Sequence, residues 1–130
     1  MRNPPIVSAH VERARGFDAF DATLELGFDV VLRRQVRMRR SDPLINVPAG
    51  RMGDANHCLV ILIGGKDVTL VEAKEERGVV TASVFLTHSG TELPAVDVPG
   101  LAGRFIDVYE ALRWADAQGW NPKVVREALK

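Results

Sequence analysis

The sequence predicts an α+β fold that is mainly β: a five-stranded barrel with a helix between its third and fourth strands and helices at the C-terminus. Three changes of hydrophobic spacing indicate this. Apolar and polar residues alternate through residues 5–40, apolar residues recur every three or four positions in 49–63, and alternation returns in 66–86 before a helical C-terminus. Spacing alone leaves this barrel as one of several α+β arrangements.

Length and composition limit what the chain can be. Its 130 residues suit a single domain, with the barrel over about 5–98 and a helical extension over about 103–130. Lys+Arg 17 balance Asp+Glu 17, so no overall field draws the chain to nucleic acid or to an anionic membrane. The single cysteine, Cys58, cannot form an internal disulfide, and the first residues lack the pattern of a secretion signal. We therefore expect an intracellular protein without a membrane partner.

The first half of the chain predicts three strands, over residues 5–13, 20–26 and 30–40. Gly27 permits the turn between the second and third strands. Asp42-Pro43 ends the third, because the residue before a proline is held extended and proline donates no ladder hydrogen bond. Alternation points Leu32 inward with Val36 and Met38. The residues expected to share one core are Leu24, Leu26, Val36, Met38, Leu59, Leu70 and Val84.

The second half predicts a helix, two strands and two further helices. Met52, Leu59 and Ile63 define the apolar face of the first helix, over 49–63. Asn121 is expected to cap the last helix, with Pro122 in its first position. The remaining expected elements are strands over 66–73 and 79–86, a short strand over 95–98 and a helix over 103–118.

Five short motifs narrow the fold. They are the turn Leu26-Gly27-Phe28, Asp18 before the second strand, Arg37 in the third, Asp42 beside Pro43, and Arg77-Gly78-Val79 after the fourth. Aligned on the turn, residues 6–86 resemble the staphylococcal nuclease-like (thermonuclease-like) family of OB-fold barrels. That family typically has an Asp-Gly-Asp-Thr run, a third-strand Arg, an Asp-x-Pro-Glu end and a Tyr-Gly-Arg turn, and none of these is intact here. Many relatives with the Leu-Gly-Phe turn are encoded by bacteriophages.

The resemblance implies a phosphodiester-cleaving site with parts missing. In the family, two carboxylates bind Ca²⁺, a glutamate handles the attacking water, and two arginines stabilise the charge on phosphorus. Leu44 stands in the glutamate's place and Val79 in the second arginine's, unless Arg77 reaches in. Each loss costs about 3 kcal/mol of transition-state stabilisation. The matching positions are Asp18 and Asp42 for the metal and Arg37 and Arg77 for catalysis, and we expect them to be vestigial, with no cofactor.

Five arginines crowd into the third strand and its end: Arg33, Arg34, Arg37, Arg39 and Arg40. Strand alternation places Arg33, Arg37 and Arg39 on one face. These three could bind phosphates, contact an acidic partner, or simply be solvated. Trp120, on the C-terminal segment, either packs on the barrel or offers a partner surface. The candidate binding residues are Arg33, Arg37, Arg39 and Trp120.

The leading functional expectation is a non-enzymatic structural or interaction module, such as a bacteriophage particle component, with a protein partner or self-assembly. It would work in the host cytoplasm or the virion. One alternative is a divergent Ca²⁺-dependent nuclease, which Leu44 in place of the glutamate disfavours. The other is a non-catalytic nucleic-acid-binding OB domain, which zero net charge and the lack of stacking aromatics on the third strand disfavour.

Overall fold

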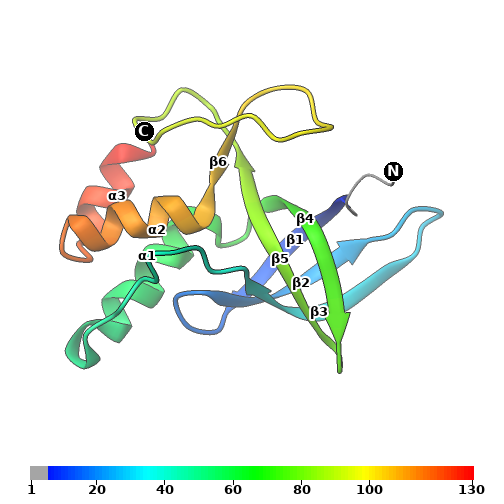
Figure 1. Cartoon of the computed structure of the whole chain (residues 1–130), viewed down its shortest axis with the longest axis horizontal. Coiled ribbons are helices and arrows are strands. Elements are labelled where there is room, and N and C mark those ends of the chain that lie inside the picture. The colour runs from blue at the N-terminus through cyan, green and yellow to red at the C-terminus, as the bar shows by residue number, and fades with distance from the viewer. Residues whose placement is uncertain (1–5) are drawn as a thin grey trace.

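The computed structural model describes residues 6–130 and contains a closed five-stranded barrel with three α-helices. The strands run in the order β3-β2-β1-β4-β5, and a parallel pairing of β3 with β5 closes the barrel (Figure 1). The strands are β1 Ile6–Ala14, β2 Ala19–Glu25, β3 Val31–Met38, β4 Asp67–Glu76, β5 Val79–Thr87 and β6 Phe105–Asp107, the last paired with β5. The helices are η1 Ala49–Arg51 (3₁₀), α1 Met52–Ile63, α2 Val108–Ala117 and α3 Pro122–Ala128. The predicted fold class is confirmed.

The barrel core is built from the inward residues of each strand, as alternation predicts. Six of the seven expected core residues are buried: Leu24, Val36, Met38, Leu59, Leu70 and Val84. The seventh prediction, Leu26, is wrong, because this side chain is 45% exposed. Its strand β2 ends at Glu25, opposite Ser8 at the last β1–β2 pair, so within residues 6–130 Leu26 lies beyond the pairing with β1.

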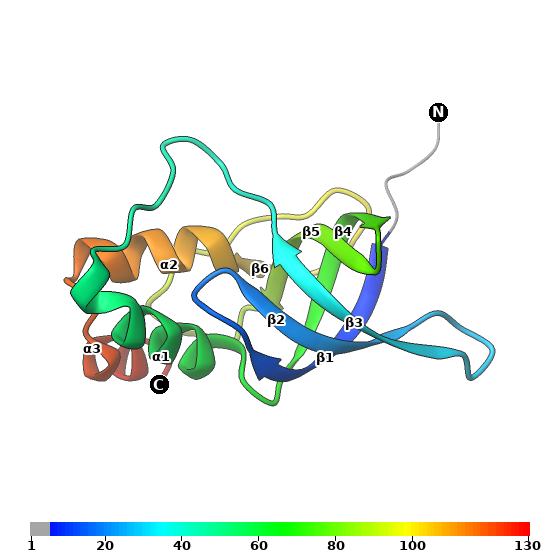
Figure 2. The ribbon, with the colours of Figure 1, turned by 90° about the horizontal axis from the view of Figure 1, so that it is seen from below.

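The helices form a layer at one end of the barrel (Figure 2). Helix α1 contacts both α2 and α3, and it buries Ala55, Cys58, Leu59, Leu62 and Ile63. Because α1 is covered by the barrel on one side and by helices on another, its buried face is wider than the single stripe expected. Met52 lies in the first turn and is exposed, contrary to the expected apolar face. Within residues 6–130, no helix combines the length and the apolar character needed to cross a bilayer.

The C-terminal region differs from expectation at its first helix. Residues 105–107 form β6 instead of helix, and α2 begins at Val108 because the Asp107 side chain accepts hydrogen bonds from the backbone N–H groups of Tyr109 and Glu110. The short strand expected over 95–98 reduces to a single bridge between Val96 and Phe105. The predicted cap of α3 is confirmed: the Asn121 side chain accepts from Lys123 N–H, and Pro122 opens the helix.

Candidate functional site

The third-strand arginines do not form one continuous patch, because carboxylates bind three of the five. Arg34 donates to Glu75 across 2.7 Å, from β3 to β4. Arg39 binds the Glu72 carboxylate and also donates to the Glu72 carbonyl at 3.0 Å. The predicted binding residue Arg39 is therefore tied to β4 by an ion pair, although its side chain remains 37% exposed. Arg33 and Arg37 are exposed, and within residues 6–130 neither has a carboxylate partner.

Asp18, a metal-ligand candidate from the resemblance, is engaged by Arg40. Its side chain lies 2.7 Å from Arg40 Nη2 and accepts from Arg40 Nε at 3.0 Å, and the residue is only 9% exposed. Asp42 is exposed and precedes Pro43 through a cis peptide bond. No three His, Cys, Asp or Glu side chains in the described part of the chain group closely enough to hold a metal ion. Ca²⁺ takes roughly six to eight oxygen ligands, so these side chains supply few of them.

The two candidate catalytic arginines lie together. Arg37 on β3 and Arg77 in the β4–β5 turn line one open hollow of about 390 Å³, with Glu76, Val79 and Thr81. Arg77 (φ 53°) and Gly78 (φ 80°) both have left-handed backbone, as the central residues of tight hairpin turns do. Val79 lines this hollow, whereas Leu44 is exposed.

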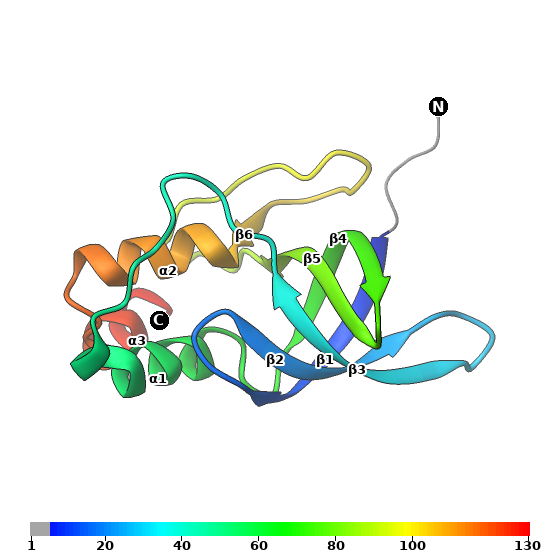
Figure 3. The ribbon, with the colours of Figure 1, turned by 60° about the horizontal axis from the view of Figure 1, so that its bottom comes forward.

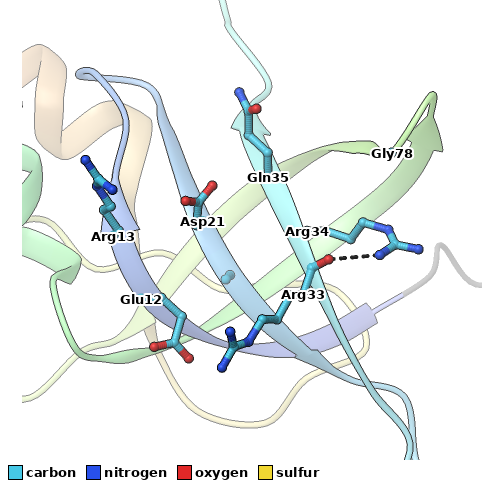
Figure 4. A pocket seen from close by; sticks show the side chains of 8 residues that line it. Glu12, Arg13, Asp21, Arg33, Arg34, Gln35 and Gly78 are labelled. Atoms are coloured by element: carbon cyan, nitrogen blue, oxygen red, sulfur yellow. Dashed lines mark hydrogen bonds between the residues drawn. The ribbon is translucent and has the colours of Figure 1, made fainter.

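A second hollow, of about 470 Å³, lies over β1, β2 and β3 (Figure 4). It is lined by both signs of charge: Arg13, Arg33 and Arg34 with Glu12 and Asp21. Asp21 is bound by Arg15 at 2.7 Å. The hollow is therefore lined by charged side chains, and its acids balance part of the positive charge of its arginines. Such a surface suits a phosphate group or an ionic protein surface better than an apolar ligand.

The β2–β3 hairpin carries an apolar surface that sequence reasoning missed. Residues 25–33, here called the hairpin arm, project from the end of the barrel opposite the helices (Figures 2 and 3). Leu32 pairs with Leu24 of β2 on one side, but the β3–β5 pairing begins only at Gln35, so no described strand covers its other side, and its expected burial is wrong. The exposed apolar side chains of the arm are Leu26, Phe28, Val30, Val31 and Leu32.

The tip of the arm is a tight turn under backbone strain. Val30 N–H donates to Gly27 O at 2.9 Å, and the two residues between them, Phe28 (φ 53°) and Asp29 (φ 61°), are left-handed. Such a conformation costs about 1–2 kcal/mol for a residue with a side chain, and Asp tolerates it better than Phe. The Phe28 side chain is nevertheless fully exposed. A large aromatic held in solvent on a strained turn is a feature that folding does not need.

Trp120 is not a surface residue, so its prediction as a binding residue is wrong. It is 2% exposed, and its ring meets the Phe17 ring edge-on at 6.2 Å between centroids. The C-terminal segment folds back onto its own chain, where α3 packs on α1 and Arg51 Nη2 donates to the Trp120 carbonyl at 3.2 Å. This packing uses the apolar side of the last helix, leaving it unavailable to a neighbour.

Comparisons of the chain with protein-family models, with curated proteins and with solved structures found no match. The resemblance to nuclease-like barrels thus rests on the five short motifs and on the barrel itself.

Proposed function

We propose that the protein is a non-enzymatic interaction module that binds a protein partner through the hairpin arm. The observation that supports this most is the group of five large apolar side chains exposed together on one projecting hairpin. Contiguous apolar surface on a soluble domain marks interaction sites, whereas scattered exposed residues need no explanation.

Energetics favour covering the arm. A two-stranded hairpin without further neighbours is at most marginally stable in water, and a third strand or a packed surface is needed to hold it. Full burial of a Phe or Leu side chain contributes about 1.5–3 kcal/mol. Phe28 and Leu26 alone would therefore supply several kcal/mol to a complex, while their exposure contributes nothing to the isolated barrel.

A photo-crosslinking amino acid at position 28 tests this function in cells that make the protein. We expect a discrete protein adduct from position 28, and none from the control position Val60, which is 42% exposed but lies on α1, far from the arm in the fold. If positions 26, 28 and 32 all give no protein adduct, the arm is not an interaction surface and the proposal fails.

For biological context we propose a bacteriophage particle, or its host's cytoplasm, solely on the resemblance of Leu26-Gly27-Phe28 to the turn of phage-encoded relatives. Cosedimentation with assembled particles tests this. The wild-type chain should sediment with them, and a Phe28→Ser variant should stay in the supernatant. If both proteins sediment equally with the particles, the arm is not what binds them.

Nucleic-acid binding is the second candidate, favoured by arginines that lack a carboxylate partner in the described structure. Arg13 and Arg33 line one hollow, and Arg37 and Arg77 line the other. Guanidinium groups that contact phosphates release counterions, so binding to single-stranded DNA should weaken steeply with salt. A paired Arg37→Gln/Arg77→Gln variant should reduce the salt slope by about two. Undetectable binding at 50 mM salt would remove this candidate.

The nuclease alternative is weaker, because Asp18 is already neutralised by Arg40 and Leu44 offers no base. We propose that purified protein does not degrade single-stranded DNA or RNA in millimolar Ca²⁺. Cleavage that requires Ca²⁺ and disappears in Asp18→Asn would overturn this and make Arg37 and Arg77 the catalytic arginines.

A further inference from the structure

The arm has a free strand edge as well as an apolar face. Strand β3 pairs with β2 from Val31 to Arg37, but its other edge pairs with β5 only from Gln35 onward. Between Val31 and Arg34, that edge faces no strand within the described residues. Free edges present unpaired N–H and C=O groups on which another strand can add.

The available backbone groups can be assigned from the hydrogen bonds at the far end of β3. Met38 N–H donates toward β2, to Asp18 O at 2.8 Å, and Arg39 N–H donates toward β5, to Ala82 O at 2.8 Å. The β2–β3 register has no bulge, so odd-numbered residues direct their backbone groups to the free edge. These residues are Val31 and Arg33. Arg34 Nη1 already donates to the Arg33 carbonyl at 2.8 Å (Figure 4), which limits the free edge at this point.

We propose that this edge pairs antiparallel with the same edge of a second copy, around a two-fold axis at Val31; the inference rests on the proposed function of the arm. Val31 then exchanges both backbone hydrogen bonds with its counterpart. Val30 lies opposite Leu32 of the second copy, and Asp29, the turn residue just before Val30, lies nearest to Arg33. Apolar residues meet apolar residues, and each acid meets a base.

Neighbouring registers are less favourable. An axis at Leu32 places Val31 opposite Arg33 and Val30 opposite Arg34. An axis at Arg33 places two like charges directly opposite each other, which is destabilising in a sheet. An axis at Val30 places Val31 opposite Asp29. Only the axis at Val31 matches both polarity and charge.

The pairing also completes the apolar face of the arm. By alternation, Leu26, Val30 and Leu32 share the side that faces the core farther along the barrel. Joining two arms gives a four-stranded sheet, β2-β3-β3-β2, with these three side chains from each copy on one face. Three or more strands with an apolar face are stable where a lone hairpin is not.

Charge reversal tests the register in the full-length chain. Sedimentation equilibrium should show a reversible dimer. Asp29→Arg or Arg33→Asp should each weaken it by about tenfold or more, because the two-fold axis makes each substitution remove two favourable pairs and create two repulsive ones. The double variant Asp29→Arg/Arg33→Asp should recover most of the affinity. Arg37→Asp, on the same strand outside the paired segment, is the matched control and should dimerise like the wild type. Circular dichroism verifies that each variant is folded.

A disulfide tests the axis itself. Cα atoms in a hydrogen-bonded antiparallel pair lie about 5.5 Å apart, within the range of a disulfide. Val31→Cys should therefore oxidise to a covalent dimer, and Arg37→Cys should not; the native Cys58 is buried. A wild-type chain that stays monomeric at all concentrations, or equal oxidation of the two variants, overturns the self-pairing. If position 28 still crosslinks to a different protein, self-pairing fails while the arm's proposed function stands; absence of any adduct removes both.

Discussion

The Asp18 carboxylate lies 2.7 Å from Nη2 of Arg40, and this ion pair joins the residue before β2 to the segment after β3. The Asp18 side chain is only 12% exposed, whereas that of Arg40 is 51% exposed. The guanidinium thus compensates a nearly buried carboxylate at the position where the nuclease-like resemblance implies a metal ligand. The Arg40 guanidinium thus pairs with the carboxylate that, by the resemblance, would bind Ca²⁺.

Replacing Arg40 should destabilise the fold more than replacing an arginine without an acidic partner. In Arg40→Met, Asp18 is left without its charged donor, and an uncompensated buried acceptor costs about 1–3 kcal/mol. Urea unfolding should show this loss. Arg13→Met is the control, because Arg13 has no carboxylate partner within residues 6–130, and it should change stability by less than about 0.5 kcal/mol. Similar losses in both variants would show that the Asp18 pair is energetically neutral.

Calcium should not stabilise the protein. A ligand that binds only the folded state stabilises it by RT ln(1 + c/Kd), where c is the free ligand concentration, so a real site would raise the thermal unfolding midpoint. Because Arg40 already neutralises Asp18, we expect the same midpoint in millimolar Ca²⁺, in millimolar Mg²⁺ and without either ion. Differential scanning calorimetry measures this. A rise specific to Ca²⁺ and absent from Asp18→Asn would restore the metal site.

The regular part of the fold was predictable because alternation records which face of a strand is buried. Alternation does not record where the neighbouring strands stop. Leu26 and Leu32 have the same alternation as the buried Leu24 and Val36. The β1–β2 pairing nevertheless stops at Glu25, before Leu26, and the β3–β5 pairing begins only at Gln35, after Leu32. The arm, and with it the candidate interaction surface, thus depends on long-range pairing that local pattern does not contain.

The charge pairs were less predictable than the strands. Arg39 was expected to share a free face with Arg33 and Arg37. It meets Glu72 because β4 has an irregularity between Val71 and Lys74, with Glu72 itself in a left-handed conformation (φ 56°). A bulge redirects a side chain that simple alternation would place elsewhere. The sequence KDVTLVEAKEE carries no glycine to mark it.

At the start of α2, Asp107 affects stability in two opposing ways: its side chain caps the helix, and its charge is partly buried. Its side chain accepts from the N–H groups of Tyr109 and Glu110, and burial raises the pKa of this carboxyl above its ordinary value. Asp107→Ala should cost about 1 kcal/mol through loss of the cap. Asp107→Asn keeps an acceptor and removes the buried charge, so it should be as stable as the wild type or more stable at neutral pH.

The pH dependence should separate the two effects. A raised pKa means that the folded state binds the proton more tightly, so this group's favourable contribution is present below the unfolded pKa and is lost as pH rises through the folded value. The wild type should lose stability relative to Asp107→Asn across that acidic window, from about pH 3.9 upward. Urea titrations at several pH values check this. Parallel pH profiles would mean that the carboxyl is not perturbed.

Cys58 should be chemically silent in the folded protein. It is fully buried on α1, and burial, with the nearby charge of Asp54 as a smaller cause, raises the pKa of its thiol to about 11. The thiolate is the reactive form, so at pH 8 the native protein should react with a disulfide reagent only through rare opening, while the urea-unfolded chain reacts at once. Val60→Cys, in the same helix but 42% exposed, provides a reactive comparison. Fast labelling of native Cys58 would indicate that α1 detaches readily.

Leu59 tests whether α1 and the barrel share one core. Its side chain is fully buried in the same cluster as Leu70 and Val84 of the barrel, whereas Val60, one position along, is 42% exposed. Leu59→Ala leaves a cavity that close-packed neighbours fill only in part, at a cost of about 2–5 kcal/mol. Val60→Ala should cost far less, because it removes atoms that already contact water. Thermal and urea unfolding measure both, and each should remain a single transition if helix and barrel unfold together. A Leu59→Ala loss no larger than that of Val60→Ala, or a separate early transition for the helix, would show that α1 rests on the barrel without contributing to its core.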